Sequence, residues 1–323
     1  MNAFLGVDTS AYTTSVAVVG ETGEVLADER ILLKVGPGKR GLRQSEAHFE
    51  HTRNLPVLME NLVPVLKKHR LLALGASDRP RRLPDSYMPV FLAGLGLCRC
   101  LASVGNYPLY LFSHQEGHIE AAVHNLPLDE PEFIAVHFSG GTSEILLVKR
   151  DHGRYEIDII LAAKDLHAGQ LVDRVGVALG LPFPSGPYME KMAEPLSTGL
   201  AIPSAVDEQG FSFSGAETRA VKMLEQGVPP ENVAYLVFKC IANTLEKGIR
   251  MAVRRHGLDK VVMAGGVMAN RFIRERLQER LRGSGIKLFW APPNLSTDNA
   301  VGSALLTRKC YYYDQEMGVS LEQ

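Results

Sequence analysis

FLGVDTSAYTTSVAVV, residues 4–19, and FIAVHFSGGTSEILLV, residues 133–148, are two stretches of 16 residues at a constant offset of 129. In both, apolar and β-branched residues flank a short run of Ser, Thr and Gly, which is the pattern of two strands joined by a tight turn. Such turns expose backbone N–H groups and hydroxyls, which suit phosphate. The repeat therefore predicts a duplicated nucleotide-binding fold with one hairpin in each half of the chain. Two unrelated surface hairpins are the alternative interpretation.

A third glycine turn lies in KVVMAGGVMANRFIRERLQERL, residues 260–281. The apolar run 261–264 predicts a buried strand, Gly265 and Gly266 form the turn, and an amphipathic helix is expected from about Asn270. The apolar stripe of that helix consists of Phe272, Ile273, Leu277 and Leu281. A turn of this kind lets a ligand approach the backbone at the positive end of a helix. Together with the two hairpins it favours a nucleotide site.

The length and composition indicate how many domains to expect and whether nucleic acid is a required partner. A chain of 323 residues with 46% apolar residues fits one large or two medium domains with a substantial core. The formal charge of −1 neither requires nor excludes nucleic acid, because a local basic patch can bind RNA on a neutral protein. Basic clusters occur at residues 67–70, 79–82 and 271–282, and solvated surfaces are the favoured interpretation of each.

The sequence also indicates a compartment. The four cysteines show neither CxxC spacing nor a disulfide pattern, which fits a reducing cytoplasm. The first residues lack the basic and apolar segments of a signal peptide. The longest apolar stretch, residues 88–97, is too short to span a membrane. The sequence therefore predicts a cytoplasmic protein with no membrane-spanning segment.

The stretch SHQEGHIEAA, residues 113–122, contains His114 and His118. On a helix, residues four apart point the same way, so the two rings could share one cation. A zinc-protease signature requires Glu directly after the first His, where this chain has Gln115. Glu116 lies about 200° round the helix and cannot face the same metal. A metalloprotease is thus a minor alternative, and spacing alone is also compatible with a His pair that binds no metal.

Seven motifs are spread over nearly the whole chain: GVDTS, SHQEGHIEAA, FSGGTSE, VDRVGVALGLPFPSGP, FSFSGAETRAV, VVMAGGVMANRFIR and STDNAVGSALL. In this order they resemble the TsaD/Gcp family of threonylcarbamoyl-transferring tRNA modification proteins, once called O-sialoglycoprotein endopeptidases. The resemblance implies an α/β fold of the actin-like ATPase and sugar-kinase (ASKHA) type. Its duplicated lobes would span residues 1–124 and 125–323, with the site in the cleft between them. The last helix, in AVGSALLTRKCYYY, could pack back on the first lobe.

The resemblance also implies the site residues. A divalent metal, Fe or Zn with Mg as a further candidate, would be held by His114, His118 and Asp298. Nucleotide contacts are implied for Ser139, Gly140, Gly141, Asp173, Gly186 and Asn270, and phosphate contacts from the first hairpin for Thr9, Ser10 and Thr13. Asp173 would bind the ribose and Gly186 would pack against the nucleoside. The alternatives are an exposed helix residue for Asp173 and a helix N-cap for Asp298, although Ser296 or Thr297 could supply that cap instead.

Several positions depart from the family pattern. Tyr12 and Thr13 stand where the family usually has an Asp-Glu pair, Thr142 stands where it has His, and Glu217 stands where it has Lys. A GPGL turn has become DRPRRLPDSYMP. The lost groups are those best able to move protons or hold a carboxylate, whereas the metal and nucleotide positions remain. The sequence therefore predicts a diverged paralog.

Two functions of different class follow. The first is an enzyme that binds ATP or threonylcarbamoyl-adenylate and transfers the threonylcarbamoyl group to N6 of an adenosine in the tRNA anticodon loop. The second is a non-catalytic or regulatory nucleotide-binding paralog that works by partner contact. The expected partners are an adenine nucleotide and tRNA, with other proteins of the threonylcarbamoyl pathway or a second copy as candidates. The sequence identifies no catalytic residue.

Overall fold

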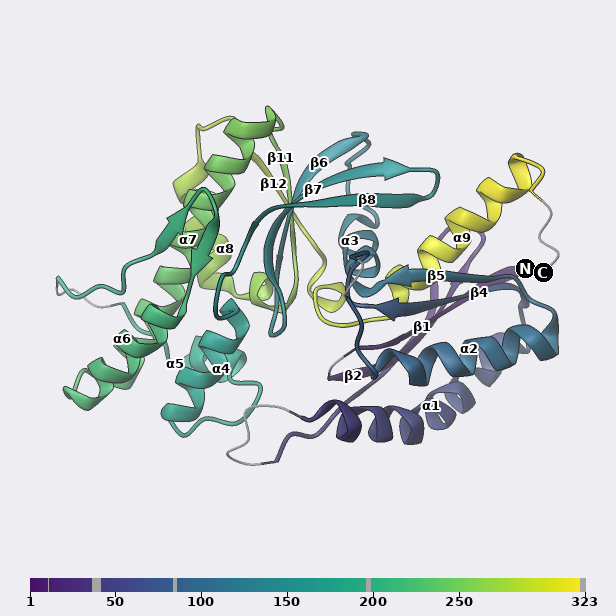
Figure 1. Cartoon of the computed structure of the whole chain (residues 1–323), viewed down its shortest axis with the longest axis horizontal. Helices are drawn as coiled ribbons and strands as arrows, with labels where there is room; N and C mark the ends of the chain where they lie inside the picture. Colours follow the sequence, from purple (N-terminus) through teal and green to yellow (C-terminus); the bar gives the residue numbers. More distant parts are fainter. Residues whose placement is uncertain (11, 37–41, 84–85, 196–198, 320–323) are drawn as a thin grey trace.

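Two hairpins with the same register lie at the centre of the fold. In the first, β1 (Asn2–Thr9) pairs antiparallel with β2 (Thr13–Gly20), and Phe4 lies opposite Val19. In the second, β6 (Glu132–Phe138) pairs with β7 (Ser143–Asp151), and Phe133 lies opposite Val148. The repeat therefore corresponds to two equivalent hairpins in a computed structural model that describes residues 1–10, 12–36, 42–83, 86–195 and 199–319 (Figure 1).

Each hairpin extends into a five-stranded sheet with the same topology. The first sheet has the order β3-β2-β1-β4-β5, in which β4 and β5 run parallel to β1. The second has the order β8-β7-β6-β11-β12, in which β11 and β12 run parallel to β6. The added strands are β3 (Val25–Leu32), β4 (Arg70–Arg79), β5 (Leu109–Ser113), β8 (Arg154–Ala162), β11 (Lys260–Ala264) and β12 (Lys287–Trp290). A small hairpin, β9 (Ala205–Asp207) and β10 (Gly210–Ser212), lies beside β8.

The helices form layers around these sheets (Figure 1). The outer face of the first sheet packs against α1 (Gln44–Leu66) and α2 (Phe91–Gly105). The helices α3 (His114–Val123) and α9 (Val301–Glu316) lie between the two sheets, in a core that includes Phe4 and Phe133. On the outer side of the second sheet, α7 (Pro230–His256) contacts β7 and β8, and a shared core joins it to α4 (Ala168–Ala178), α5 (Gly186–Met192), α6 (Ser214–Glu225) and α8 (Arg271–Leu281). None of the described helices is long and apolar enough to cross a membrane.

The helix α9 comes from the far end of the sequence yet packs on the first sheet. It contacts β1, β2 and β4, and its approach to β1 is close because Gly6 carries no side chain. A Cβ at Gly6 would lie 2.5 Å from the carbonyl oxygen of Ala300. Backbone of the C-terminal segment thus lies directly against the first hairpin, and this places Asp298 near the N-terminal half of the chain.

Two helix starts can be compared with their sequence patterns. The predicted helix start near Asn270 is confirmed: Asn270 is the N-cap of α8, and its side-chain oxygen accepts a hydrogen bond from the Ile273 N–H at 2.9 Å. The expectation that Ser296 or Thr297 caps the last helix is wrong. The side chain of Asn299 instead accepts from the Gly302 N–H at 3.3 Å. Asp298 is therefore not used as a cap.

Candidate metal centre and nucleotide cavity

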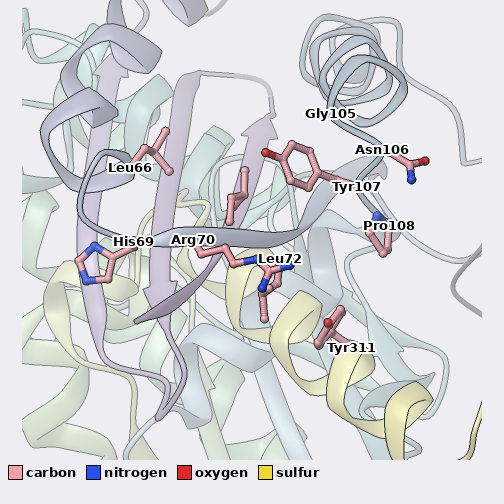
Figure 2. Close-up of a pocket in the computed structure, with 10 residues that line it drawn as sticks. Leu66, His69, Arg70, Leu72, Gly105, Asn106, Tyr107, Pro108 and Tyr311 are labelled. Carbon is pink, nitrogen blue, oxygen red and sulfur yellow. The ribbon is translucent and has the colours of Figure 1, made fainter.

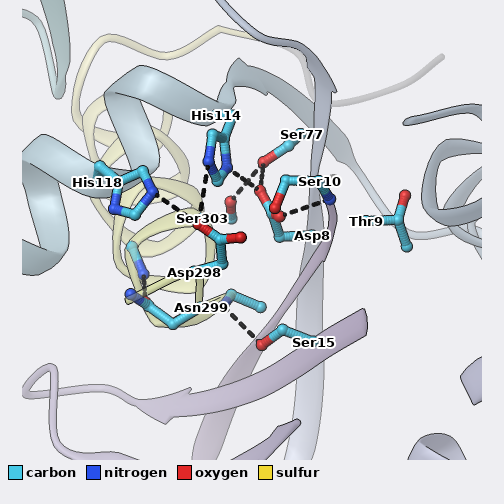
Figure 3. Close-up of polar contacts among 12 residues, drawn as sticks. Asp8, Thr9, Ser10, Ser15, Ser77, His114, His118, Asp298, Asn299 and Ser303 are labelled. Carbon is cyan, nitrogen blue, oxygen red and sulfur yellow. Dashed lines mark hydrogen bonds and ion pairs between the residues drawn. The ribbon is translucent and has the colours of Figure 1, made fainter. Parts of the chain in front are cut away.

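His114 and His118 project from the first turns of α3 toward the same point (Figure 3). The helix starts at His114 because Ser113 and Glu116 form a capping box, in which each side chain binds the backbone N–H of the other residue. The centres of the two imidazole rings lie 4.4 Å apart. The spacing of four residues thus produces the predicted pair of adjacent rings.

Asp298 completes a cluster with this pair. Its Oδ1 atom lies 3.2 Å from Nε2 of His118 and 3.6 Å from Nε2 of His114. One ligand atom from each of the three residues lies within 4.8 Å of the others, so a single cation could contact all three. Two imidazole nitrogens and one carboxylate form a donor set that suits Zn or Fe, and three protein ligands leave positions open for other groups.

Asp8 orients the first histidine. Its Oδ2 atom lies 2.9 Å from Nδ1 of His114, so the other ring nitrogen, Nε2, faces Asp298. Asp8 is itself fixed by Ser77 and by the backbone N–H of Ser10 at 3.0 Å (Figure 3). A carboxylate that holds the second nitrogen of a metal-binding histidine is a common supporting contact. The sequence predicted a phosphate hairpin here but gave Asp8 no role.

The electrostatics of the cluster fit a cation. Burial lowers the pKa of His114, but the carboxylates of Asp8 and Asp298 outweigh burial and raise it to about 10. Burial raises the pKa of Asp298, yet contacts with His114 and His118 outweigh that effect and hold it well below the usual range. The two carboxylates therefore favour a positive charge between them, which a protonated His114 can supply. A divalent metal between neutral imidazoles would replace that proton and supply the charge instead.

A cavity of about 420 Å³ opens beside this cluster, and Asp298 lies on its wall. Its wall includes the tip of the first hairpin, the turn of the second, the start of α4, the turn before α5 and the turn after β11. Five of the six predicted nucleotide residues line it: Ser139, Gly140, Asp173, Gly186 and Asn270. Residues from both halves of the chain line the cavity, where these four turns, far apart in the sequence, converge.

The remaining predicted residues are placed differently. Thr13 lines the cavity, but Gly141, Thr9 and Ser10 do not. Thr9 turns toward α2, where its hydroxyl donates to the Val90 carbonyl at 3.0 Å and accepts from the Gly94 N–H at 3.2 Å. Ser10 is buried, and its backbone N–H binds Asp8. In the first hairpin, therefore, the structure brings only Thr13 of the three to the cavity.

Three of the lining residues have distinct local settings. Asp173 accepts a hydrogen bond from the Ser185 N–H at 2.8 Å, and burial raises the pKa of its carboxyl. Gly186 is open: an added Cβ would meet only Val172, at 3.9 Å. Asn270 uses its side-chain oxygen to cap α8, which leaves its amide nitrogen as the group that could contact a ligand. Asp173 is thus half-buried at the cavity wall rather than fully exposed on its helix.

Of the departures from the family pattern, Tyr12 and Thr13 line the cavity and Glu217 contacts a residue of its wall. The Tyr12 ring lies 5.5 Å from the Phe183 ring, and both line the wall. Glu217 forms an ion pair with Arg174, also a lining residue, at 3.1 Å. In the altered loop, Arg81 forms an ion pair with buried Glu144 of β7 at 2.8 Å. Pro84 and Asp85 of this loop lie outside the described residues, and so does Ala11 of the first hairpin.

A second, larger hollow of about 690 Å³ is a weaker candidate (Figure 2). It is lined by residues before and at the start of β4 and β5, among them His69, Arg70 and Pro108, and by Tyr311 of α9. Ligands of open α/β sheets bind beyond the carboxyl ends of the strands, and this hollow lies at the amino ends. His114 follows the carboxyl end of β5 directly, which favours the cavity beside Asp298.

Comparison with known proteins gives a consistent family. A family model described as TsaD, tRNA N6-adenosine threonylcarbamoyltransferase, matches residues 86–305. A protein named tRNA N6-adenosine threonylcarbamoyltransferase from Thermus thermophilus is 32% identical over 306 residues, which cover 93% of this chain and 90% of that protein.

Solved structures share the fold at low sequence identity. Component A of the (R)-2-hydroxyglutaryl-CoA dehydratase of Acidaminococcus fermentans is 17% identical, with a TM-score of 0.58 and coverage of 96% of this chain and 98% of that chain. A ROK family glucokinase from Streptomyces griseus, in complex with glucose and AMPPNP, is 13% identical, with a TM-score of 0.54 and coverage of 95% and 100%. The fold is that of the actin-like ATPases and sugar kinases, as the sequence predicts.

Proposed function

The chain belongs to the TsaD family of tRNA N6-adenosine threonylcarbamoyltransferases, and from that premise we propose that it acts in tRNA threonylcarbamoyladenosine modification. Its ligand would be threonylcarbamoyl-adenylate or ATP, bound in the cavity between the lobes. A divalent metal would be bound by His114, His118 and Asp298. The acceptor would be N6 of an adenosine in the tRNA anticodon loop.

One observation carries this proposal: Asp298 belongs both to the histidine cluster and to the wall of the nucleotide cavity. A metal at the cluster would therefore lie beside the ligand rather than in a separate structural site. The predicted ribose and nucleoside residues, Asp173, Gly186 and Asn270, line the same cavity. A nucleotide held by these groups could direct its phosphate toward Asp298.

The proposed reaction is an acyl transfer. The N6 amine of adenosine forms a bond to the carbamoyl carbon, the bond from that carbon to the phosphate oxygen breaks, AMP leaves, and the amine loses one proton. When bound, a metal would polarise a carbonyl or hold phosphate oxygens. The chain's own residues would orient the adenylate: Asp173 through the ribose, Asn270 through its amide, and the turn at Ser139 and Gly140 through backbone N–H groups.

A non-catalytic nucleotide-binding role is the second candidate, and the cavity contains the observation that favours it. Tyr12 and Thr13 supply a phenol and a hydroxyl at the wall, and Glu217 pairs with Arg174. The phenol and the hydroxyl are neutral at pH 7 and are not ready proton acceptors, and the Glu217 carboxylate is engaged by the Arg174 guanidinium. A metalloprotease receives no support, because Glu116 binds Ser113 and Arg82, and Gln115 binds Glu144.

A direct transfer assay tests the proposal. Purified protein would be mixed with synthetic threonylcarbamoyl-adenylate and unmodified tRNA, and the modified nucleoside measured by mass spectrometry. Asp298→Asn is the matched test variant, because it keeps the shape of the side chain and removes its charge. Product from the native chain and little from the variant would support the enzyme. Tight nucleotide binding without product would favour the non-catalytic role.

A further inference from the structure

A third histidine lies against the cluster and has no assigned role. His137 is the penultimate residue of β6 and is 2% exposed. Its ring centre lies 4.6 Å from that of His118. Neither of its ring nitrogens has a hydrogen-bond partner among the residues that the structure describes. A buried imidazole with two unpaired nitrogens is costly, so its presence among the apolar residues that make up the rest of the stretch 133–138 calls for a function.

The direction of His137 follows from the alternation of the strand. Phe133 and Ala135 belong to the core between the sheets, whereas Ile134, Val136 and Phe138 belong to the core on the opposite face. His137 shares the parity of Phe133 and Ala135, and its contact with His118 agrees with that side. The strand therefore directs this imidazole toward α3 and not toward the outer helices.

His118 also has one ring nitrogen without a hydrogen-bond partner within the described residue ranges. Its Nε2 atom faces Asp298, but its Nδ1 atom is buried without a partner in the described part of the chain. The equivalent nitrogen of His114 is held by Asp8 at 2.9 Å. Metal-binding histidines almost always donate their second N–H to a nearby acceptor, which fixes the tautomer and the ring orientation. For His118, the polar side chain that packs against its ring from the far side of the cluster is His137.

We propose that His137 is a positioning residue of the metal centre, in which one of its ring nitrogens accepts the Nδ1–H of His118, directly after a small ring rotation or through one buried water. The inference rests on the proposed metal site at His114, His118 and Asp298. In this role His137 would fix the ring orientation of His118, as the Asp8 carboxylate fixes that of His114. The difference is chemical: a neutral imidazole orients His118 without adding a third negative charge to a cluster that already contains two carboxylates.

Metal affinity tests the proposal. Zn²⁺ binding would be measured by competition with a chromophoric chelator for the native chain, His137→Leu and His137→Gln. The Leu variant removes the acceptor, and the Gln variant supplies an amide oxygen in its place. Val136→Ala is the matched control, because Val136 is buried on the same strand with its side chain on the other face. Loss of a hydrogen bond that orients a metal-binding side chain typically weakens metal binding by about 10–100-fold.

The expected result is weaker Zn²⁺ binding by His137→Leu, substantial recovery in His137→Gln, and native affinity in Val136→Ala. X-ray absorption of the native Zn²⁺ complex should count two imidazoles. Native affinity in His137→Leu would overturn the positioning role alone. A count of three imidazoles would also overturn it, because His137 would then bind the metal directly. Absence of Zn²⁺ binding by the native chain would overturn both this inference and the metal site on which it rests.

Discussion

Gly302 of α9 lies directly against the backbone of Gly117 in α3, so that a Cβ at Gly302 would come within 1.8 Å of the Gly117 carbonyl oxygen. Two helices can approach this closely only where no side chain separates them. His118 follows Gly117, and Asp298 precedes Gly302 by four residues, just before α9 begins. The crossing of α3 and α9 therefore sets the distance between two of the three candidate metal ligands.

Substitution of Gly302 tests this relationship. Gly302→Ala should push α9 away from α3, lower stability by about 1–3 kcal/mol as overpacking does, and weaken metal binding. Gly117→Ala is the matched control, because a Cβ there would meet only Ser303, at 3.4 Å or more. Thermal unfolding and Zn²⁺ titration provide the measurements. Equal effects of the two substitutions would contradict this account of the crossing.

Removal of the histidines should remove the metal. His114→Ala and His118→Ala are each expected to lose most bound metal, because two remaining ligands hold a cation weakly. The sequence suggested that both rings lie on a helix surface, but His118 is 3% exposed, so its substitution should also lower stability. Elemental analysis of purified variants is the measurement, with His124→Ala at the far end of α3 as the control. Full occupancy in both variants would exclude the site.

Asp173 should contribute to nucleoside affinity. Asp173→Asn should weaken adenosine binding by about 1–3 kcal/mol, the range for hydrogen bonds to a charged group. Asn keeps one oxygen that can accept from the Ser185 N–H, so the local turn should persist. Calorimetric titration with adenosine avoids changes in phosphate charge. An unchanged affinity would mean that the ribose binds elsewhere.

Gly186 offers a test of ligand position that spares the fold. Gly186→Ala should leave the melting temperature unchanged, because the new methyl group meets only Val172 at an ordinary contact distance of 3.9 Å. It should nevertheless weaken adenosine binding, because the methyl group would enter the cavity where the nucleoside packs. Calorimetry and thermal unfolding of the same sample separate the two effects. Native affinity would place the nucleoside away from α5.

The departures at the first hairpin should limit transfer. Burial raises the pKa of Tyr12, so its ring is neutral at pH 7, and Thr13 carries no charge. We expect the native chain to transfer threonylcarbamoyl to tRNA weakly or not at all by itself, with metal and nucleotide binding intact. The double variant Tyr12→Asp and Thr13→Glu should raise product formation in the nucleoside assay, although Glu217 still pairs with Arg174.

Two comparisons make this last test decisive. Tyr12→Phe keeps the ring that packs on Phe183 and should leave activity as it is. An undiverged family member sets the scale for full turnover. Native turnover equal to that scale would show that the carboxylate pair is dispensable and that the divergence has been misinterpreted.

Local patterns in the sequence predicted the hairpins, the helix capped by Asn270 and the adjacent rings of His114 and His118. Each of these depends on neighbours within a few residues, so spacing alone reveals it. The role of Asp8 could not be predicted, because its partner lies 106 residues away. His137 did leave a signal, a histidine in an apolar strand, but its neighbour His118 becomes evident only when α3 packs against β6.

The position of α9 also has a consequence for synthesis of the chain. The strands of the first sheet are complete once Ser113 has been made, yet the inner face of that sheet is covered by residues 301–316. Lobes usually fold as units from the N-terminus as the ribosome extends the chain. Here the first sheet cannot complete its core before residues 301–316 have been made. Its apolar inner face, including Phe4 and Phe112, stays without its covering helix until the ribosome has produced every strand of the second sheet.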